Sequence, residues 1–333
     1  MSAPAISVAM SVYNCERFLA PAIESILAQS YGDFEFLILN DGSTDQSAAI
    51  IDAFAAQDSR IRPIHRANKG LIVSLNQLLA ESRAPLIARM DGDDISKPER
   101  FAQQIAFMKA HPDHGVLGTW TEDMDEDGAP YHMTGSDHPV TNEEFQRVVG
   151  DRSPLCHPSV MMRRELALEA GGYHAAFRHC EDYDLWLRLA SRTKICSIPE
   201  RLLRYRHSPG QVSTKHVVEQ QYGVAVSRLA WQARQAGRPD PTEHLDQLPP
   251  FEGLDALFGQ AGQSEQARGM VAEALLYSPV ALKGNGFGII VDHVHDSAKT
   301  RSRITGLPRT VLRLMRLGEP ARAASLAAAL MLG

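Results

Sequence analysis

The chain has 333 residues, of which 44% are hydrophobic and 22% charged, and its formal net charge is −6 at pH 7. This composition is typical of a globular protein with a sizeable core, and it gives no support to nucleic-acid binding as the main task. No apolar run approaches the roughly 20 residues that span a bilayer. The length exceeds the commonest single-domain size, so we expect one large domain and an added region.

The four cysteines form no closely spaced pair and suggest no disulfide framework. In a chain of this length we expect them to be reduced and mostly buried, which indicates a reducing compartment. The N-terminal residues lack the basic start of a signal peptide, so a cytoplasmic location is expected. The cysteines are Cys15, Cys156, Cys180 and Cys196.

The N-terminal third of the chain alternates between short apolar runs and helical patterns. The runs predict strands at residues 5–13, 34–40, 60–66 and 84–90, and the patterns between them predict helices at residues 21–30, 48–57 and 71–82. This alternation predicts βαβ units and a mostly parallel sheet. Ligands of such sheets bind beyond the carboxyl ends of the strands. Polar residues at these ends should therefore converge on one edge: Tyr13, Asn14, Asn40, Asp41, Arg66, Asn68, Lys69 and Asp91–Asp94.

The alternation stops near residue 115. Residues 116–133 are expected to form strands joined by a turn, and residues 194–207 one or two further strands. Helices are expected at residues 165–170 and 181–193, and the pattern is helical from about residue 215 onward, with proline-rich breaks at 238–241 and 249–250. We therefore predict an α/β domain over residues 1–210, divided near residue 115, and a helical C-terminal region over residues 211–333.

The stretch ARMDGDD (88–94) places three carboxylates where the fourth strand ends. Asp91 and Asp93 project to the same side of an extended chain, which suits a hard divalent cation such as Mg²⁺ or Mn²⁺. The alternative is a solvated turn in which Asp94 caps the helix that begins near Pro98.

Two further acidic motifs stand at strand–helix boundaries. In NDGSTDQS (40–47), Asp41 either belongs to a simple turn or accepts a hydrogen bond from a bound ligand. In EDYDLWLRL (181–189), the acids of the first turn either complement the helix dipole or include a general base.

The motifs SVYN (11–14), NDGSTD (40–45), ARMDGDDISKPERF (88–101), GGY (171–173) and EDYDLWLRL (181–189) follow one another in this order. Together with ILAQSYGDFEFLIL (26–39), this series resembles the inverting nucleotide-sugar glycosyltransferases of family 2, which have the GT-A fold. The resemblance covers residues 5 to about 210. It implies a nucleotide-binding part at 1–115 and an acceptor part at 116–210, and it does not extend to the helical C-terminus.

The resemblance also implies roles for the donor-binding residues. The carboxylate at Asp41 would contact the nucleobase, and Tyr13 would lie against the base. Asp91 and Asp93 match the DxD motif that holds the metal–diphosphate–ribose group, with Asp93 as the more direct metal ligand and Asp94 as a helper.

For the acceptor side, the resemblance implies that Asp182 is the catalytic base and that Glu181 shapes its surroundings. The family's processive synthases carry a (Q/R)xxRW motif that this sequence lacks, so a polymer-extruding synthase is not expected. The implied activity is metal-dependent transfer of a sugar from a nucleotide-diphosphate donor, a UDP-sugar, to a hydroxyl of a glycan or lipid-linked acceptor.

Four further residues are weaker candidates. His207 follows a predicted strand and either approaches the metal or lies in a surface loop. Arg204 and Arg206 alternate along one strand face, where they either reach phosphate oxygens or are solvated. His157 is a candidate for the acceptor pocket.

The C-terminal residues are basic, with seven Lys and Arg from Lys299 onward against the single acid Glu319. Arg309, Arg313 and Arg316 are spaced along one helical face. Such a helix either lies on an anionic membrane, at the inner face of the cell membrane, or is a packing helix with exposed arginines.

Two other function classes are consistent with an α/β sheet and clustered carboxylates. A nucleotidyltransferase should carry a glycine-rich phosphate loop near its N-terminus, and AMSVYNCERFL is not such a loop. A non-catalytic sugar-nucleotide-binding module differs from the enzyme, by sequence, only at Asp182.

Overall fold

The computed structural model describes residues 3–131, 135–208, 215–300 and 306–332. The chain forms two compact units. The first comprises Met1–His174 and Leu185–Ser208, and the second comprises Ala175–Asp184 and Pro209–Gly333. The domain boundary expected at residue 210 lies outside the described residues.

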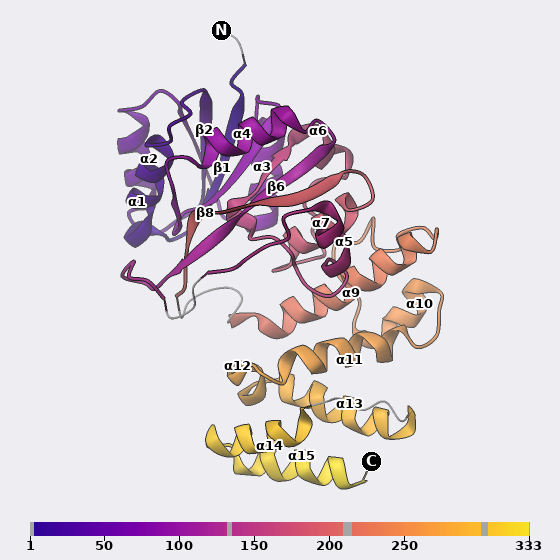
Figure 1. Ribbon diagram of the computed structural model, residues 1–333. Helices are drawn as coiled ribbons and strands as arrows, with labels where there is room; N and C mark the ends of the chain where they lie inside the picture. Colours follow the sequence, from indigo (N-terminus) through magenta and orange to yellow (C-terminus); the bar gives the residue numbers. More distant parts are fainter. Residues whose placement is uncertain (1–2, 132–134, 209–214, 301–305, 333) are drawn as a thin grey trace. The chain divides into compact units, whose positions relative to one another are not determined.

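The first unit is built around one eight-stranded sheet with strand order β3-β2-β1-β4-β7-β6-β8-β5 (Figure 1). Strands β1 to β4 pair in parallel, as do β6 and β8, whereas β7 pairs antiparallel with both neighbours and β5 pairs antiparallel with β8. The α/β fold with a mostly parallel sheet, predicted from the alternation, is thus confirmed. The strands are β1 (Ile6–Val12), β2 (Phe34–Asp41), β3 (Ile61–Arg66), β4 (Leu86–Asp91), β5 (Ile95–Ser96), β6 (His114–Met124), β7 (Met161–Arg163) and β8 (Lys194–Arg206).

Helices cover both faces of the parallel part of this sheet. Alternate residues of β1, from Ile6 to Val12, share one apolar core with side chains of α1, α2 and α4. Helix α3 also contacts β1 and β2. Ala9 of β1, which is not part of that core, is buried as well. Burial on both faces explains why these strands are continuously apolar. The helices of this unit are α1 (Glu16–Leu27), α2 (Ser47–Ala55), α3 (Leu71–Glu81), α4 (Arg100–Ala110), α5 (Asn142–Val148) and α6 (Arg164–Glu169), with a 3₁₀ turn at His157–Ser159.

Helix α1 begins at Glu16, five residues before the predicted start, and contains Pro21 within it. Its first turn is held by long-range contacts, because the Glu16 amide donates to Asp45 and the Glu16 carboxylate accepts from the Gln46 amide. These partners are about thirty residues away in sequence and are invisible to a local pattern.

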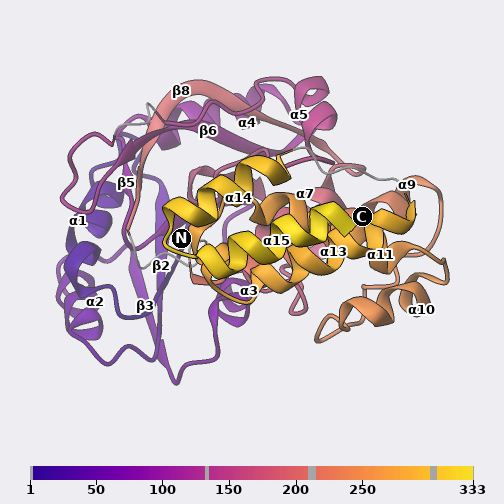
Figure 2. The ribbon, with the colours of Figure 1, turned by 90° about the horizontal axis from the view of Figure 1, so that it is seen from below.

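The second unit is helical, as predicted. Helix α11 contacts α9 and α13, α13 contacts α15, and α14 and α15 lie side by side (Figure 2). A continuous apolar core joins these helices to Ala176, Phe177 and Cys180. The helices are α9 (Val217–Gln235), α10 (Leu254–Phe258), α11 (Gln263–Leu275), α12 (Pro279–Lys283), α13 (Gly286–Thr300), α14 (Leu307–Arg316) and α15 (Pro320–Leu332), and α7 (Glu181–Leu189) begins in this unit.

No helix among the described residues combines the length and the apolar character that a membrane span requires. Cys180 and Cys196 are buried and Cys15 and Cys156 are partly buried. That the four thiols are reduced stays a prediction.

The turn after β2 depends on Gly42. Its φ of +75° lies in the left-handed region, and a Cβ at this position would stand 2.6 Å from the backbone nitrogen of Asn68. Both features exclude a side chain, because left-handed backbone costs about 1–2 kcal/mol for most residues and a contact below 3 Å forces the loop to move.

We expect Gly42→Ala to lower the free energy of unfolding by more than Gly171→Ala does. Gly171 has a similar φ of +84° but no atom within 4 Å of the added Cβ, so this control carries the backbone strain of about 1–2 kcal/mol without the clash. Urea unfolding of both variants measures the difference. An equal decrease in the free energy of unfolding of both variants would show that the loop at Asn68 moves away from the added Cβ without cost.

Candidate functional site

The carboxyl ends of the parallel strands lie level with one another at one edge of the sheet. Val12 of β1 pairs with Asn40 of β2, and Asp41 pairs with Arg66 of β3. On the other side of β1, Ser11 pairs with Asp91 of β4. The structure therefore brings the polar strand ends together at one edge, as the sequence predicts for a parallel sheet.

Asp41 is buried, with 2% of its surface exposed. Its Oδ1 accepts hydrogen bonds from Arg66 Nε and from the Lys69 amide, both at 3.0 Å, and its Oδ2 accepts from the Gly70 amide at 2.8 Å. Arg66 also donates to Ser74 and Gln77 of α3. The carboxylate thus fixes the loop between β3 and α3, and its predicted contact with a nucleobase stays a prediction.

The loop after β1 is joined to the loop after β2. Asn14 has φ +50°, a conformation that asparagine tolerates better than most residues. Its amide donates to Ser43 Oγ at 3.0 Å, and its Oδ1 accepts from the Thr44 amide at 2.8 Å. Tyr13 beside it is 55% exposed. Its ring is therefore free to contact a ligand at this edge, as the resemblance implies.

Three carboxylates follow the end of β4. Oxygen atoms of Asp91, Asp93 and Asp94 lie within 4.8 Å of one another. Burial and the charge of Asp91 raise the pKa of Asp93 to about 6, and burial with the charge of Asp93 raises the pKa of Asp94 well above its ordinary value. Without a cation, these groups therefore resist full ionisation.

Two arginines stabilise this cluster from the protein side. Arg89 is buried on β4 and pairs with Asp91 Oδ1. The backbone amide of Arg206 donates to Asp94 Oδ1 at 2.9 Å, and its Nε donates to the Asp93 carbonyl at 2.7 Å. The second oxygen of Asp94, Oδ2, is buried and has no hydrogen-bond partner within the described part of the chain.

The carboxylate cluster fits a hard divalent cation. It offers only oxygen atoms, one of them buried without a partner, and Mg²⁺ and Mn²⁺ favour such ligands. The structure distinguishes between the two roles that the sequence left open for Asp94, a place in a cation site and a cap of the following helix. Its side chain accepts from Arg206 of β8, whereas the residue before α4 is Glu99 and caps the helix without a side-chain hydrogen bond.

The β8 candidates hold loops around this cluster. Arg206 is 6% exposed and also donates to the carbonyls of Asp125 and Glu126, and Arg204 donates to the Gly128 carbonyl at 2.7 Å. From the sequence we expected these guanidinium groups either to contact a phosphate or to be solvated. They instead donate to backbone carbonyls of the loop after β6. A phosphate contact of either arginine stays a prediction.

His207 stands directly after β8. Its Nε2 lies 3.2 Å from Asp123 Oδ1, and its ring stacks on Tyr131 at a centroid distance of 4.8 Å. The histidine is therefore paired with a carboxylate of β6, and its predicted approach to the metal is untested.

His157 begins the 3₁₀ turn at His157–Ser159. Its Nε2 is 2.9 Å from the Tyr173 hydroxyl, and its ring contacts Trp186 edge to face. Burial, with the charge of Arg89, holds the pKa of His157 well below its ordinary value, so the ring is neutral at pH 7. The predicted role of His157 in an acceptor pocket stays a prediction.

Glu181 and Asp182 belong to the second unit, where they open helix α7 as the sequence predicts. Glu181 is buried and Asp182 partly exposed. The Asp184 amide donates to the Cys180 carbonyl at 3.0 Å, which begins the helix at this point. Asp182 is thus a partly exposed carboxylate at a helix start, and its role as base stays a prediction.

Sequence reasoning missed the two buried arginines beside the motif. Arg89 and Asp91 are two positions apart on one strand, so they share a face, and this spacing was a usable signal. Arg100 is fully buried and donates to the Arg89 carbonyl at 2.8 Å, and burial lowers its pKa to about 9. No local pattern indicates that contact.

The sequence of the chain is similar to those of known proteins. A sequence model of the family "Glycosyl transferase family 2" matches residues 7–172. The chain is 40% identical over 191 residues to "Putative glycosyltransferase EpsE" of Bacillus subtilis, covering 56% of this chain and 67% of that protein. It is 30% identical over 205 residues to "O-antigen biosynthesis glycosyltransferase WbnJ" of Escherichia coli, covering 60% and 79%.

Solved structures are similar over nearly the whole chain. The crystal structure of S. aureus TarS 1–349 in complex with UDP has a TM-score of 0.59 at 16% identity, covering 98% of this chain and 90% of that one. Mannosyltransferase PcManGT of Pyrobaculum calidifontis, in complex with GDP-Man and Mn²⁺, has a TM-score of 0.54 at 14% identity, covering 99% and 88%. Similarity at these identities bears on the fold, and the predicted GT-A fold is confirmed.

The raised pKa of Asp93 predicts a pH dependence of stability without divalent cations. The folded chain binds this proton more tightly than the unfolded chain, whose carboxyl has a pKa near 3.8. The free energy of unfolding should therefore fall as pH rises from about 4 to about 6. Asp93→Asn removes this contribution, of order 1–3 kcal/mol, and should be more stable than wild type at pH 7.

Urea unfolding in EDTA between pH 4.5 and 7 measures this difference. The exposed residue Glu243 offers a control, because Glu243→Gln should leave the slope of the wild type unchanged. A wild-type slope that persists in Asp93→Asn would contradict the assignment of the proton to Asp93.

Proposed function

Because this chain belongs to glycosyl transferase family 2, we propose that it is a metal-dependent, inverting glycosyltransferase that uses a nucleotide-diphosphate sugar, with UDP as the nucleotide. The observation that carries this proposal is the cluster of Asp91, Asp93 and Asp94 at the carboxyl edge of the parallel strands. The sugar is a hexose type and its acceptor is a hydroxyl of a glycan or of a lipid-linked glycan.

The relatives support the nucleotide and the metal. TarS structures are described in complex with UDP and with UDP-GlcNAc, and PcManGT with GDP-Man and Mn²⁺. We propose Mn²⁺ or Mg²⁺ as the cofactor here, since the cluster offers oxygen ligands alone. WbnJ and AmsE of Erwinia amylovora are named for O-antigen and amylovoran biosynthesis. This agrees with a role in making a surface polysaccharide.

We assign donor binding to the edge that Tyr13, Asp41 and Asp91 share. The exposed ring of Tyr13 offers a surface for the base. Oδ1 of Asp41 accepts two hydrogen bonds, whereas Oδ2 accepts one, from the Gly70 amide. A carboxylate oxygen can accept two, so Oδ2 would accept the hydrogen bond from the base. Binding of the base would then change the position of Arg66 and residues 67–70, which Asp41 holds in place.

Asp93 and Asp91 would hold the metal, and Asp94 would support them through its contact with Arg206. When bound, a divalent cation neutralises the negative charge that the departing nucleotide diphosphate gains. Arg89 would orient Asp91 for this task through the ion pair on β4.

Asp182 would act as the general base for the acceptor. An alcohol hydroxyl is a weak nucleophile, so a carboxylate must accept its proton as the new glycosidic bond forms. Attack on the face opposite the leaving nucleotide inverts the anomeric carbon. Glu181 is buried beside Asp182 and would fix its orientation.

Two substitutions separate binding from transfer. We expect Asp182→Asn to lower the rate of sugar transfer by about 10²-fold or more, because it removes the base, while Mn²⁺ with UDP still raises the melting temperature as in wild type. Asp93→Ala should abolish both transfer and the Mn²⁺-dependent part of the thermal shift.

The measurement is a thermal-shift screen of UDP, GDP and their sugars with and without Mn²⁺, followed by a transfer assay with the best donor. Asp137→Asn at an exposed position serves as the matched control. Wild-type transfer by Asp182→Asn would refute the base assignment, and a UDP shift without Mn²⁺ dependence would refute the role of Asp93.

We also propose that helix α14 contacts an anionic membrane surface near a lipid-linked acceptor. Arg309, Leu312, Met315 and Arg316 are exposed on this helix, with spacings that place them on one side. Arg313, which the sequence grouped with them, instead donates to the Leu276 carbonyl at 2.6 Å and stacks on Tyr277. Two exposed apolar side chains between two arginines fit an interface of anionic headgroups. Arg301 and Arg303 of the basic tail lie outside the described residues.

Vesicle flotation tests this contact. We expect the full chain to float with vesicles rich in phosphatidylglycerol and not with pure phosphatidylcholine, and the double variant Leu312→Ser, Met315→Ser to bind about tenfold less. Val280→Ser, at an exposed apolar residue of α12, is the control. Equal flotation of the double variant and wild type would refute the proposal.

A further inference from the structure

Three groups of metal-binding side chains occur among the described residues. One is the carboxylate cluster of the donor site. The second consists of His111, Asp113 and His114 in the first unit, and the third consists of His179, His216 and Glu219 in the second unit. The two histidine-containing groups differ in whether their carboxylate is available.

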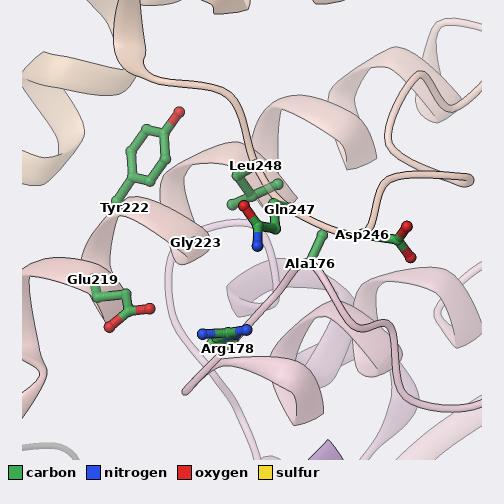
Figure 3. Close-up of a pocket in the computed structure, with 8 residues that line it drawn as sticks. All are labelled: Ala176, Arg178, Glu219, Tyr222, Gly223, Asp246, Gln247 and Leu248. Carbon is green, nitrogen blue, oxygen red and sulfur yellow. The ribbon is translucent and has the colours of Figure 1, made fainter.

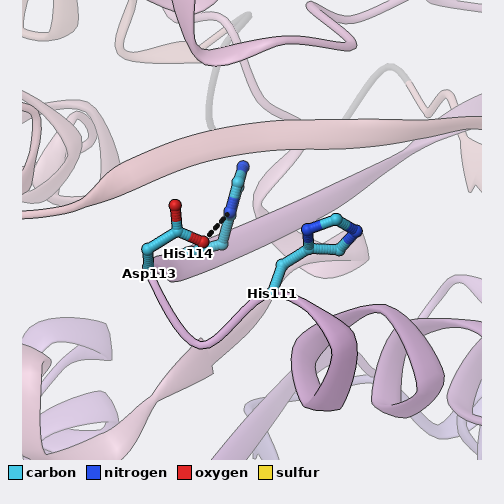
Figure 4. A group of neighbouring side chains, drawn as sticks. All are labelled: His111, Asp113 and His114. Atoms are coloured by element: carbon cyan, nitrogen blue, oxygen red, sulfur yellow. Dashed lines mark hydrogen bonds and ion pairs between the residues drawn. The ribbon is translucent and has the colours of Figure 1, made fainter.

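In the second group the carboxylate of Asp113 already has cationic partners. Lys194 Nζ lies 2.7 Å from Asp113 Oδ2, and His114 Nδ1 lies 3.0 Å from Oδ1 (Figure 4). The ammonium group of Lys194 competes with a metal ion for the same oxygen. This group is therefore a surface ion-pair network.

In the third group the carboxylate faces two imidazoles. Glu219 Oε2 lies 3.5 Å from His179 Nε2 and 3.6 Å from His216 Nδ1. A tetrahedral zinc ion bound at about 2.0–2.1 Å separates its ligand atoms by roughly 3.4 Å. Two of the three separations in this group are therefore near those of a bound state. The two imidazole rings are stacked with their centroids 4.3 Å apart, so metal binding requires one ring to rotate out of this stack.

The backbone around this group is held in place. His179 has φ +66°, an uncommon value for a residue other than glycine, and its carbonyl accepts from Gln220 Nε2 at 2.8 Å. One turn further along α9, a Cβ on Gly223 would stand 2.5 Å from Cys180 Sγ. The segment before α7 thus lies tightly against the first turns of α9, which keeps His179 opposite Glu219.

The group borders a cavity of about 230 Å³ within the second unit (Figure 3). Figure 3 shows that Glu219 lines it together with Arg178, Tyr222 and residues 246–248. The side chains of His216 and Glu219 are about half exposed. A metal ion held here would keep coordination positions open to water or to a small anionic ligand.

We propose that His179, His216 and Glu219 form a second metal site that binds a divalent transition-metal ion, with Zn²⁺ as the best match. Two imidazole nitrogens and one carboxylate oxygen favour Zn²⁺ over Mg²⁺, whereas the all-oxygen cluster at Asp91 and Asp93 has the opposite preference. The ion would join α9 to the segment that leads into α7, three residues before Asp182. The site does not depend on the proposed donor chemistry.

Zinc binding to the full-length, untagged Asp93→Ala variant tests the proposal, because this variant removes the central carboxylate of the donor-site cluster. We expect one Zn²⁺ per chain by isothermal titration, and intense visible absorption bands of four-coordinate Co²⁺ that zinc removes. His216→Ala and Glu219→Gln, each in the same background, should lower the affinity by about tenfold or more.

His244→Ala is the matched control, because this histidine is in the same unit and its side chain is 91% exposed. Thermal unfolding in EDTA establishes that each variant is folded, and the two substitutions act as independent checks on each other. Unchanged zinc affinity in both His216→Ala and Glu219→Gln, or equal loss in His244→Ala, would overturn the proposal. Absence of zinc binding to Asp93→Ala would overturn it as well, and none of these outcomes bears on sugar transfer.

Discussion

The edge at which the parallel strands end depends on three carboxylates that the chain places close together. Asp91, Asp93 and Asp94 stand within four positions where β4 ends, and burial with the charge of the neighbouring carboxylates raises the pKa of Asp93 and of Asp94. Two neighbouring arginines offset part of the repulsion among these carboxylates. Arg89 pairs with Asp91 from within the strand, and Arg206 binds the loop through its amide and guanidinium. The negative charge that remains is the basis of the cation site proposed above.

The same principle of fixing charge through neighbouring strands recurs at Asp41. Its carboxylate ties β2 to Arg66 of β3 and to two amides of the following loop. Because the parallel strands end level, groups that are far apart in sequence become neighbours without any long loop reaching across.

The sequence was sufficient for the α/β fold and for the convergence of the polar strand ends on one edge, because both follow from apolar runs and the residues that end them. It failed where a residue's partner is distant. The start of α1 at Glu16 rests on contacts with Asp45 and Gln46, and the role of Arg206 rests on loops of β4 and β6. His179 and Glu219 are forty residues apart and meet only in the folded second unit. Periodicity reports which face is buried but carries no information on which side chains meet there.

Cys15 shows how the carboxylate cluster affects chemistry beyond metal binding. Its thiol donates to the Gly92 carbonyl at 3.2 Å, and burial with the charges of Asp93 and Asp91 raises its pKa to about 12. Thiolates, and not thiols, react with peroxides and alkylating agents. Burial and the neighbouring carboxylates thus keep Cys15 as the neutral thiol, the form that reacts slowly with oxidants, so the residue that joins the loop after β1 to Gly92 is chemically protected by its own surroundings.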